Sequence, residues 1–119
     1  MARLRVEGIA TAATAVLSAG QALIAVEAGA DVVIPFLGRA ETSGIDSAGL
    51  VQDVAWIAAD AGRRVLAASV KTEAHVRMAL HAGCWAATLP PDLARTLGRN
   101  DAAKTAIDAF RRTGGSEDE

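Results

Sequence analysis

The sequence contains little of what marks several large classes of proteins. Cys84 is the only cysteine among 119 residues, so no disulfide can form within the chain. This is typical of a reducing compartment and predicts a cytoplasmic location. The net charge is -2 at pH 7, and both signs are scattered along the chain. Because there is no basic stripe for nucleic acid and no polybasic patch for a membrane surface, we expect neither partner.

Signatures of membrane spans, phosphate loops and metal sites are also missing. Glu7 interrupts the alanine-rich start, whose short apolar run predicts neither a signal peptide nor a membrane span. No glycine-rich phosphate loop and no H-E-x-x-H string occurs. His75 and His81 are six positions apart, whereas two ligands on one helix face lie about four apart. We therefore expect no metal site and no cofactor.

What the sequence does contain is an alternation of apolar runs and helical segments. Unbroken apolar runs are typical of strands buried on both faces, and those expected here are 9–17, 31–37, 64–70 and 84–90. The helices are expected to start at capping residues and to stop at glycines. Their expected extents are Ser18 to Gly29, Asp46 or Ser47 to Gly62, Thr72 to Gly83, Pro91 to near Gly98, and Asp101 to Arg112 after Asn100 as cap.

This order predicts an α/β fold with four parallel strand-helix units and a tail helix. We expect one domain over residues 1–112, with the tail helix at 101–112 and a flexible acidic tail at 113–119. Four parallel strands leave two open edges, whereas a barrel of this type closes with eight. Three arrangements are open: an open or doubly wound sheet, a barrel completed by a second copy, or a barrel completed by a complementary half-barrel chain.

Ligands of parallel α/β folds bind beyond the carboxyl ends of the strands. Arg39 and Ser69 follow two of the expected strands, and Thr72 begins a helix. A guanidinium, a hydroxyl and a helix N-terminus at one edge would suit a phosphate. The alternative is that Arg39 pairs with Glu41 or Asp46 in a solvated loop.

Other candidates also have structural interpretations. Thr14 and Ser69 can be small hydroxyls that bond neighbouring backbone, and Gly38 can be an ordinary turn residue. We expect Trp56 and Trp85 to pack in the core or at an interface. Cys84, between Gly83 and Trp85, is expected to be a buried core thiol.

Two long segments, GIATAATAVLSAGQALIAVEAGADVVIPFLGR and VLAASVKTEAHVRMALHAGCWAATLPPDL, resemble the transaldolase family. Within it they are most similar to the small bacterial branch that includes fructose-6-phosphate aldolase. The resemblance implies a TIM-type barrel that forms a Schiff base between a lysine and a ketose phosphate and cleaves or forms a carbon-carbon bond. It covers nearly the whole chain in register.

The resemblance also implies roles for individual residues. Arg39 and Ser69 match the arginine and serine that hold the phosphate of the sugar phosphate. Thr14 matches a threonine that helps to hold the catalytic water. Phe36 stands where the aldolase branch has a tyrosine and transaldolases proper have a phenylalanine.

In the family that the chain resembles, the catalytic lysine lies on the fourth barrel strand and an aspartate on the first. The resemblance implies that the matched part begins at the fifth strand, so we expect neither group in these residues. Lys71 and Lys104 are the only lysines here, and a solvated, protonated amine such as Lys71 is a poor imine former. Three hypotheses are therefore open for the chain. It is an aldolase or transaldolase that needs another polypeptide, a half-barrel that binds phosphate or phosphosugar without catalysis, or a purely structural homo-oligomer.

Overall fold

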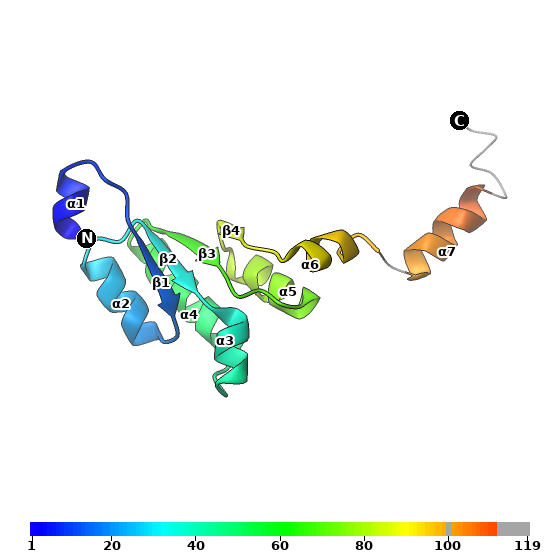
Figure 1. Ribbon diagram of the computed structural model, residues 1–119, viewed down its shortest axis with the longest axis horizontal. Coiled ribbons are helices and arrows are strands. Elements are labelled where there is room, and N and C mark those ends of the chain that lie inside the picture. The colour runs from blue at the N-terminus through cyan, green and yellow to red at the C-terminus, as the bar shows by residue number, and fades with distance from the viewer. Residues whose placement is uncertain (100, 112–119) are drawn as a thin grey trace.

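The computed structural model describes residues 1–99 and 101–111, in which helices and short strands alternate (Figure 1). The strands are β1 (Ala12–Val16), β2 (Val32–Pro35), β3 (Arg64–Ala67) and β4 (Ala86–Ala87). The helices are α1 (Ala2–Val6), α2 (Ala19–Glu27), α3 (Leu37–Thr42), α4 (Ser47–Asp60), α5 (Glu73–Ala82), α6 (Pro91–Thr96) and α7 (Asp101–Phe110).

The four strands form one parallel sheet in the order β1-β2-β3-β4. Each strand therefore pairs with the next one along the chain, and helical segments make the crossovers. This succession is the arrangement of one half of a TIM-type barrel. It confirms the expected α/β fold of four parallel strand-helix units, in which β1 and β4 are the two edge strands.

The hydrophobic core lies between one face of the sheet and a layer formed by α2, α4 and α5 (Figure 1). Val33 and Val65 point from the sheet into this layer and are almost fully buried, whereas Ile34 and Leu66, which follow them, are only partly buried. Many of the buried helix residues are alanines, which let the helices approach the strands closely. Opposite faces of the sheet are therefore covered to different extents.

Capping residues define the helix ends that the sequence predicts most directly. The Ser18 hydroxyl accepts the N–H of Gln21 at 3.1 Å, and the Thr72 hydroxyl accepts the N–H of His75 at 3.2 Å. Gly83 ends α5 in the left-handed conformation, with φ at +78°. The predicted start of α2 and the predicted start and end of α5 are therefore confirmed.

The sequence predicts neither of two short helices. α1 precedes the first strand, and α3 occupies a segment whose pattern predicts the end of a strand followed by a loop. The strands are also shorter than the apolar runs that contain them. Asp46 precedes α4 as expected but makes no side-chain capping bond there, while Ser47 donates its hydroxyl to the carbonyl of Leu37 at 2.7 Å.

The two tryptophans do not lie in the core. Trp56 is 73% exposed on α4, and Trp85 is 57% exposed directly before β4, where the Arg64 guanidinium lies 4.7 Å from its ring centre. The core interpretation of both residues is wrong, because the helix layer is filled by alanine and valine side chains instead. Packing of the tryptophans at an interface remains a prediction.

α7 lies far from the sheet, at the opposite end of the picture from α1 (Figure 1). None of its residues from Asp101 to Phe110 is buried. The expected cap Asn100, the last residue of the expected tail helix, Arg112, and the acidic tail 113–119 lie outside the described residues. Within the described part, no helix combines the length and the apolar character that crossing a membrane requires.

Candidate functional site

The carboxyl ends of β2 and β3 are joined to the first turn of α3 by backbone contacts. Beyond the last regular pair of β2 and β3, Phe36 still bridges to Ala68. The N–H groups of Leu37 and Gly38 then donate to the carbonyls of Ala68 and Ser69 at 2.9 and 2.7 Å. These bonds run from α3 to the segment after β3. They therefore fix the start of α3 at the carboxyl ends of the strands.

One further bond brings together the two residues that the sequence singles out for phosphate binding. The backbone N–H of Arg39 donates to the Ser69 hydroxyl oxygen at 3.1 Å. The two residues are 30 positions apart in the sequence, and they meet because parallel strands end at the same edge of the sheet. The first amides of α3 are used in these contacts, so this short helix offers no open N-terminus to a ligand.

Gly38 is required for this close approach. A Cβ atom at Gly38 would lie 2.6 Å from the carbonyl oxygen of Ser69 and 2.8 Å from Cγ of Lys71. The first contact is with backbone and cannot be relieved by a side-chain rotation. Gly38 is therefore needed for this close contact, and the Lys71 side chain passes directly over it.

Ser69 combines an unusual backbone with a hydroxyl that is only partly used. Its φ is +54°, in the left-handed region that residues other than glycine enter rarely. The hydroxyl oxygen accepts the Arg39 N–H, which leaves the hydroxyl proton for another acceptor. This geometry suits donation to an anion that lies next to Arg39.

The Arg39 side chain is exposed and is carried by α3, not by a loop. Glu41 pairs with His75 instead, at 2.7 Å. Among the described residues no ion pair joins Arg39 to Glu41 or to Asp46. The loop-pairing alternative for Arg39 is therefore wrong in this structure, and its guanidinium faces solvent at the strand ends.

Sequence reasoning missed the connection made by His75. This side chain is buried, and its Nδ1 accepts the backbone N–H of Lys71 at 3.0 Å while Nε2 lies 2.7 Å from the Glu41 carboxylate. A sequence feature that points to it is the spacing Thr72-x-x-His75. It resembles a capping box, in which the third helical residue reaches back to the backbone before the helix.

Phe36 lies directly after β2, and Thr14 lies on the neighbouring strand β1. Phe36 is partly buried directly before α3 and bridges to Ala68, the residue before Ser69. Thr14 is exposed on β1, where the pairing with β2 shifts between Ala13 and Val16. Such bulges re-aim side chains near sites. The hydrogen bonds of the described residues do not include one from Thr14 to Arg39 or Ser69.

Cys84 and the two histidines are the residues here whose side chains redox or metal chemistry would use. Cys84 is partly buried beside both halves of the core, and burial raises the pKa of its thiol, which disfavours the reactive thiolate. In residues 1–99 and 101–111, no three His, Cys, Asp or Glu side chains gather as metal ligands would.

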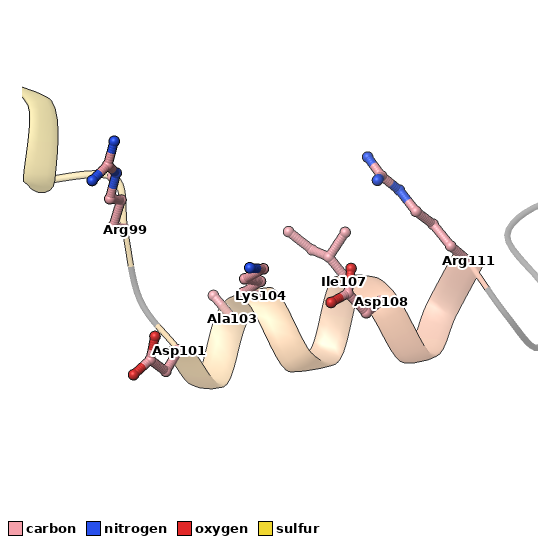
Figure 2. Close-up of a pocket in the computed structure, with 8 residues that line it drawn as sticks. Arg99, Asp101, Ala103, Lys104, Ile107, Asp108 and Arg111 are labelled. Atoms are coloured by element: carbon pink, nitrogen blue, oxygen red, sulfur yellow. The ribbon is translucent and has the colours of Figure 1, made fainter.

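A hollow of about 560 Å³ lies along α7 and is distinct from the strand ends (Figure 2). Figure 2 shows Lys104 and Arg111 along this helix together with Asp101 and Asp108. The hollow is bordered by α7 and the segment before it, and no strand contributes to it. It is a solvated surface of mixed charge, so we place the candidate site at the carboxyl ends of β2 and β3.

The fold and this site define a class of protein, a parallel half-barrel with a guanidinium and a hydroxyl at the carboxyl ends of adjacent strands. Within that class, the chain belongs to the transaldolase/fructose-6-phosphate aldolase family, whose model matches residues 1–118. It is 38% identical over 106 residues to a protein described as "Probable transaldolase" from Phenylobacterium zucineum (strain HLK1). That match covers 87% of this chain but 49% of the relative, so the chain spans about half the length of the relative.

Proposed function

We propose that this chain forms the phosphate-binding part of a transaldolase-type active site. In this proposal the Arg39 guanidinium and the Ser69 hydroxyl hold the phosphate group of a sugar phosphate. The observation that carries the proposal is the 3.1 Å bond from the Arg39 N–H to the Ser69 hydroxyl oxygen. It holds two donors at one point of the sheet edge, and both side chains keep protons that they can donate to an anion.

The charges around the pair support a phosphate over a neutral ligand. The Lys71 side chain passes close to Gly38, the residue before Arg39, and adds a second cation to this edge. Exposed guanidinium and ammonium groups attract a dianionic phosphate, and the guanidinium fork can contact two of its oxygens at once. Lys71 then contributes charge to the site, and we do not assign it the role of nucleophile.

The carbon-carbon bond chemistry of the family belongs to the same proposal. The Schiff-base lysine would come from strands other than β1 to β4, either from further polypeptide or from a complementary half-barrel. Thr14 and Phe36 would have supporting roles, Thr14 by holding a water and Phe36 by lining the sugar. Parallel strands that end at one edge of a barrel would bring these groups together.

Binding of fructose 6-phosphate to variants of the full chain tests the phosphate site. Arg39→Ala removes a charge-assisted contact worth about 1.5 to 3 kcal/mol, so we expect roughly tenfold to hundredfold weaker binding by calorimetry. Arg77→Ala is the matched control, because it removes the same charge from an exposed position on α5. Equal affinities of the two variants would contradict the proposal.

An assembly function is the second candidate, and the open edges of the sheet favour it. β1 and β4 each pair on one side only within the described residues. Unpaired edges of a parallel sheet are stabilised when another chain pairs with them. We propose that the chain associates through these edges, with a second copy or with a complementary half-barrel.

A further inference from the structure

The His75 ring is almost completely buried, with 1% of the residue exposed, and both of its nitrogens have partners. Nδ1 lies 3.0 Å from the backbone nitrogen of Lys71, and Nε2 lies 2.7 Å from the Glu41 carboxylate. A buried imidazole with two directed partners is held in a single orientation. The proposed phosphate chemistry makes no direct use of this group.

The backbone contact determines which nitrogen carries the proton. The N–H of Lys71 can only donate, so Nδ1 of His75 must accept and cannot itself be protonated in this arrangement. The ring proton then lies on Nε2 and is donated to the carboxylate of Glu41. A hydrogen bond to a carboxylate is stronger than one between neutral groups, which suits a fixed connection.

This connection joins two segments that carry the anion-binding groups. Glu41 belongs to α3, which also carries Arg39, whereas Lys71 belongs to the segment after β3, which also carries Ser69. α3 has only six residues, and isolated helices of this length are not stable on their own. Its orientation therefore depends on contacts with the rest of the chain.

The contacts of α3 with the chain after β3 lie at two places along the helix. At its start, the amides of Leu37, Gly38 and Arg39 bond to Ala68 and Ser69. One turn later, the Glu41 carboxylate bonds to the His75 ring. α3 also packs against α4, where Leu37 and Ala40 are buried. The Glu41 contact adds a second fixed point between α3 and the chain after β3. The Arg39 side chain leaves the helix between the two contacts.

We propose that His75 is a positioning residue of the anion site, which joins Glu41 to the Lys71 backbone and thereby holds the Arg39 guanidinium beside the Ser69 hydroxyl. This rests on the proposed phosphate site. It assigns to His75 no contact with the ligand. It also explains why a carboxylate, Glu41, lies close to an anion-binding site, since this carboxylate holds the His75 ring.

Two substitutions of Glu41 separate positioning from electrostatics, because both remove the same negative charge. Charge removal alone favours anion binding and acts equally in both variants. Glu41→Gln keeps an oxygen that accepts from Nε2, whereas Glu41→Ala does not. We expect Glu41→Ala to bind fructose 6-phosphate about three- to tenfold more weakly than Glu41→Gln, as the loss of one hydrogen bond implies. The Glu41 side chain is 61% exposed, so both variants should fold.

A substitution of His75 tests the other side of the same contact. In His75→Asn the amide oxygen takes the place of Nδ1 and can still accept from Lys71, but the side chain no longer reaches Glu41. Because Glu41 keeps its charge in this variant, we expect His75→Asn to bind fructose 6-phosphate about three- to tenfold more weakly than the unaltered chain. The double variant should be no weaker than either single variant, because all three lose one shared interaction. Thermal unfolding of each variant shows whether lost stability, not lost positioning, explains the change.

Hydrogen exchange adds a measurement that needs no ligand. The Arg39 amide should exchange faster in Glu41→Ala than in Glu41→Gln, since its bond to Ser69 depends on the orientation of α3. Equal binding and equal exchange in the two Glu41 variants would overturn the positioning role, even where Arg39→Ala weakens binding as expected. If Arg39→Ala instead binds as Arg77→Ala does, the phosphate site itself is wrong, and the positioning role is overturned with it.

Discussion

Ser69 holds its backbone in the left-handed region, at φ of +54°, which costs a residue with a Cβ about 1 to 2 kcal/mol. Its carbonyl and hydroxyl oxygens both accept N–H groups from the first turn of α3. The conformation therefore presents two acceptors to α3 and leaves the hydroxyl proton for a ligand. Backbone strain of this kind is often found at binding sites.

Two substitutions of Ser69 separate the backbone cost from the hydroxyl. Ser69→Ala keeps the free-energy cost of the left-handed backbone and loses the hydroxyl, whereas Ser69→Gly loses both. We expect the glycine variant to be more stable than the alanine variant by about 1 kcal/mol in urea unfolding. Both should bind fructose 6-phosphate more weakly than the unaltered chain.

Ala15 provides the control, because its φ of +58° carries the same cost away from Ser69. Ala15→Gly should stabilise the chain without weakening phosphate binding. If Ser69→Ala bound the sugar phosphate as well as the unaltered chain does, the hydroxyl would have no role in the site.

Single residues differ in how far the sequence predicts their roles. Arg39 and Ser69 follow recognisable strands, so the rule that parallel strands end at one edge is enough to place them close together. His75 cannot be placed in this way, because its partner Glu41 is 34 positions away on a helix that the sequence does not predict. The geometry of α3 is needed to see that contact.

At the scale of elements, helices with capping residues are predicted better than helices held by distant contacts. α2 and α5 start at Ser18 and Thr72 as expected, because the capping bonds are local in sequence. α3 has no side-chain cap and too few residues to be stable alone. It forms because Ala68 and Ser69 accept its first amides, and such long-range bonds leave no periodic pattern in the sequence.

The cap of α5 matters to the site because His75 is the third residue of this helix. Thr72→Ala removes the hydroxyl that accepts the His75 N–H, so we expect a loss of about 1 kcal/mol in the free energy of unfolding. Thr72→Ser keeps the hydroxyl and should retain most of the stability. Thermal or urea unfolding measures both. Equal stabilities of the alanine and serine variants would show that the cap contributes nothing to α5.

At the scale of the whole molecule, the sheet is half of a barrel with two edges. The succession of four parallel strand-helix units could be predicted from apolar runs and helix caps, and the structure confirms it. The consecutive order of the strands within the sheet followed from the family resemblance alone, because the residues also allowed a doubly wound sheet. How the edges are completed could not be predicted, because the side chains of a buried parallel strand look alike whether its neighbour belongs to the same chain or another. The two exposed tryptophans show the same limit, since aromatic side chains suit a core and an interface equally.

The association proposed through the sheet edges can be tested at β4. Thr88 donates its backbone N–H to the carbonyl of Ala67, so by the alternation along a strand the N–H of Ala87 faces the open side. Ala87→Pro removes this donor and leaves the pairing with β3 in place. Light scattering over a range of concentrations should give a mass above one chain for the unaltered protein and a lower mass for this variant, with circular dichroism to show that both are folded. A mass of one chain at every concentration would exclude self-association, and an unchanged mass in Ala87→Pro would place the contact elsewhere than at β4.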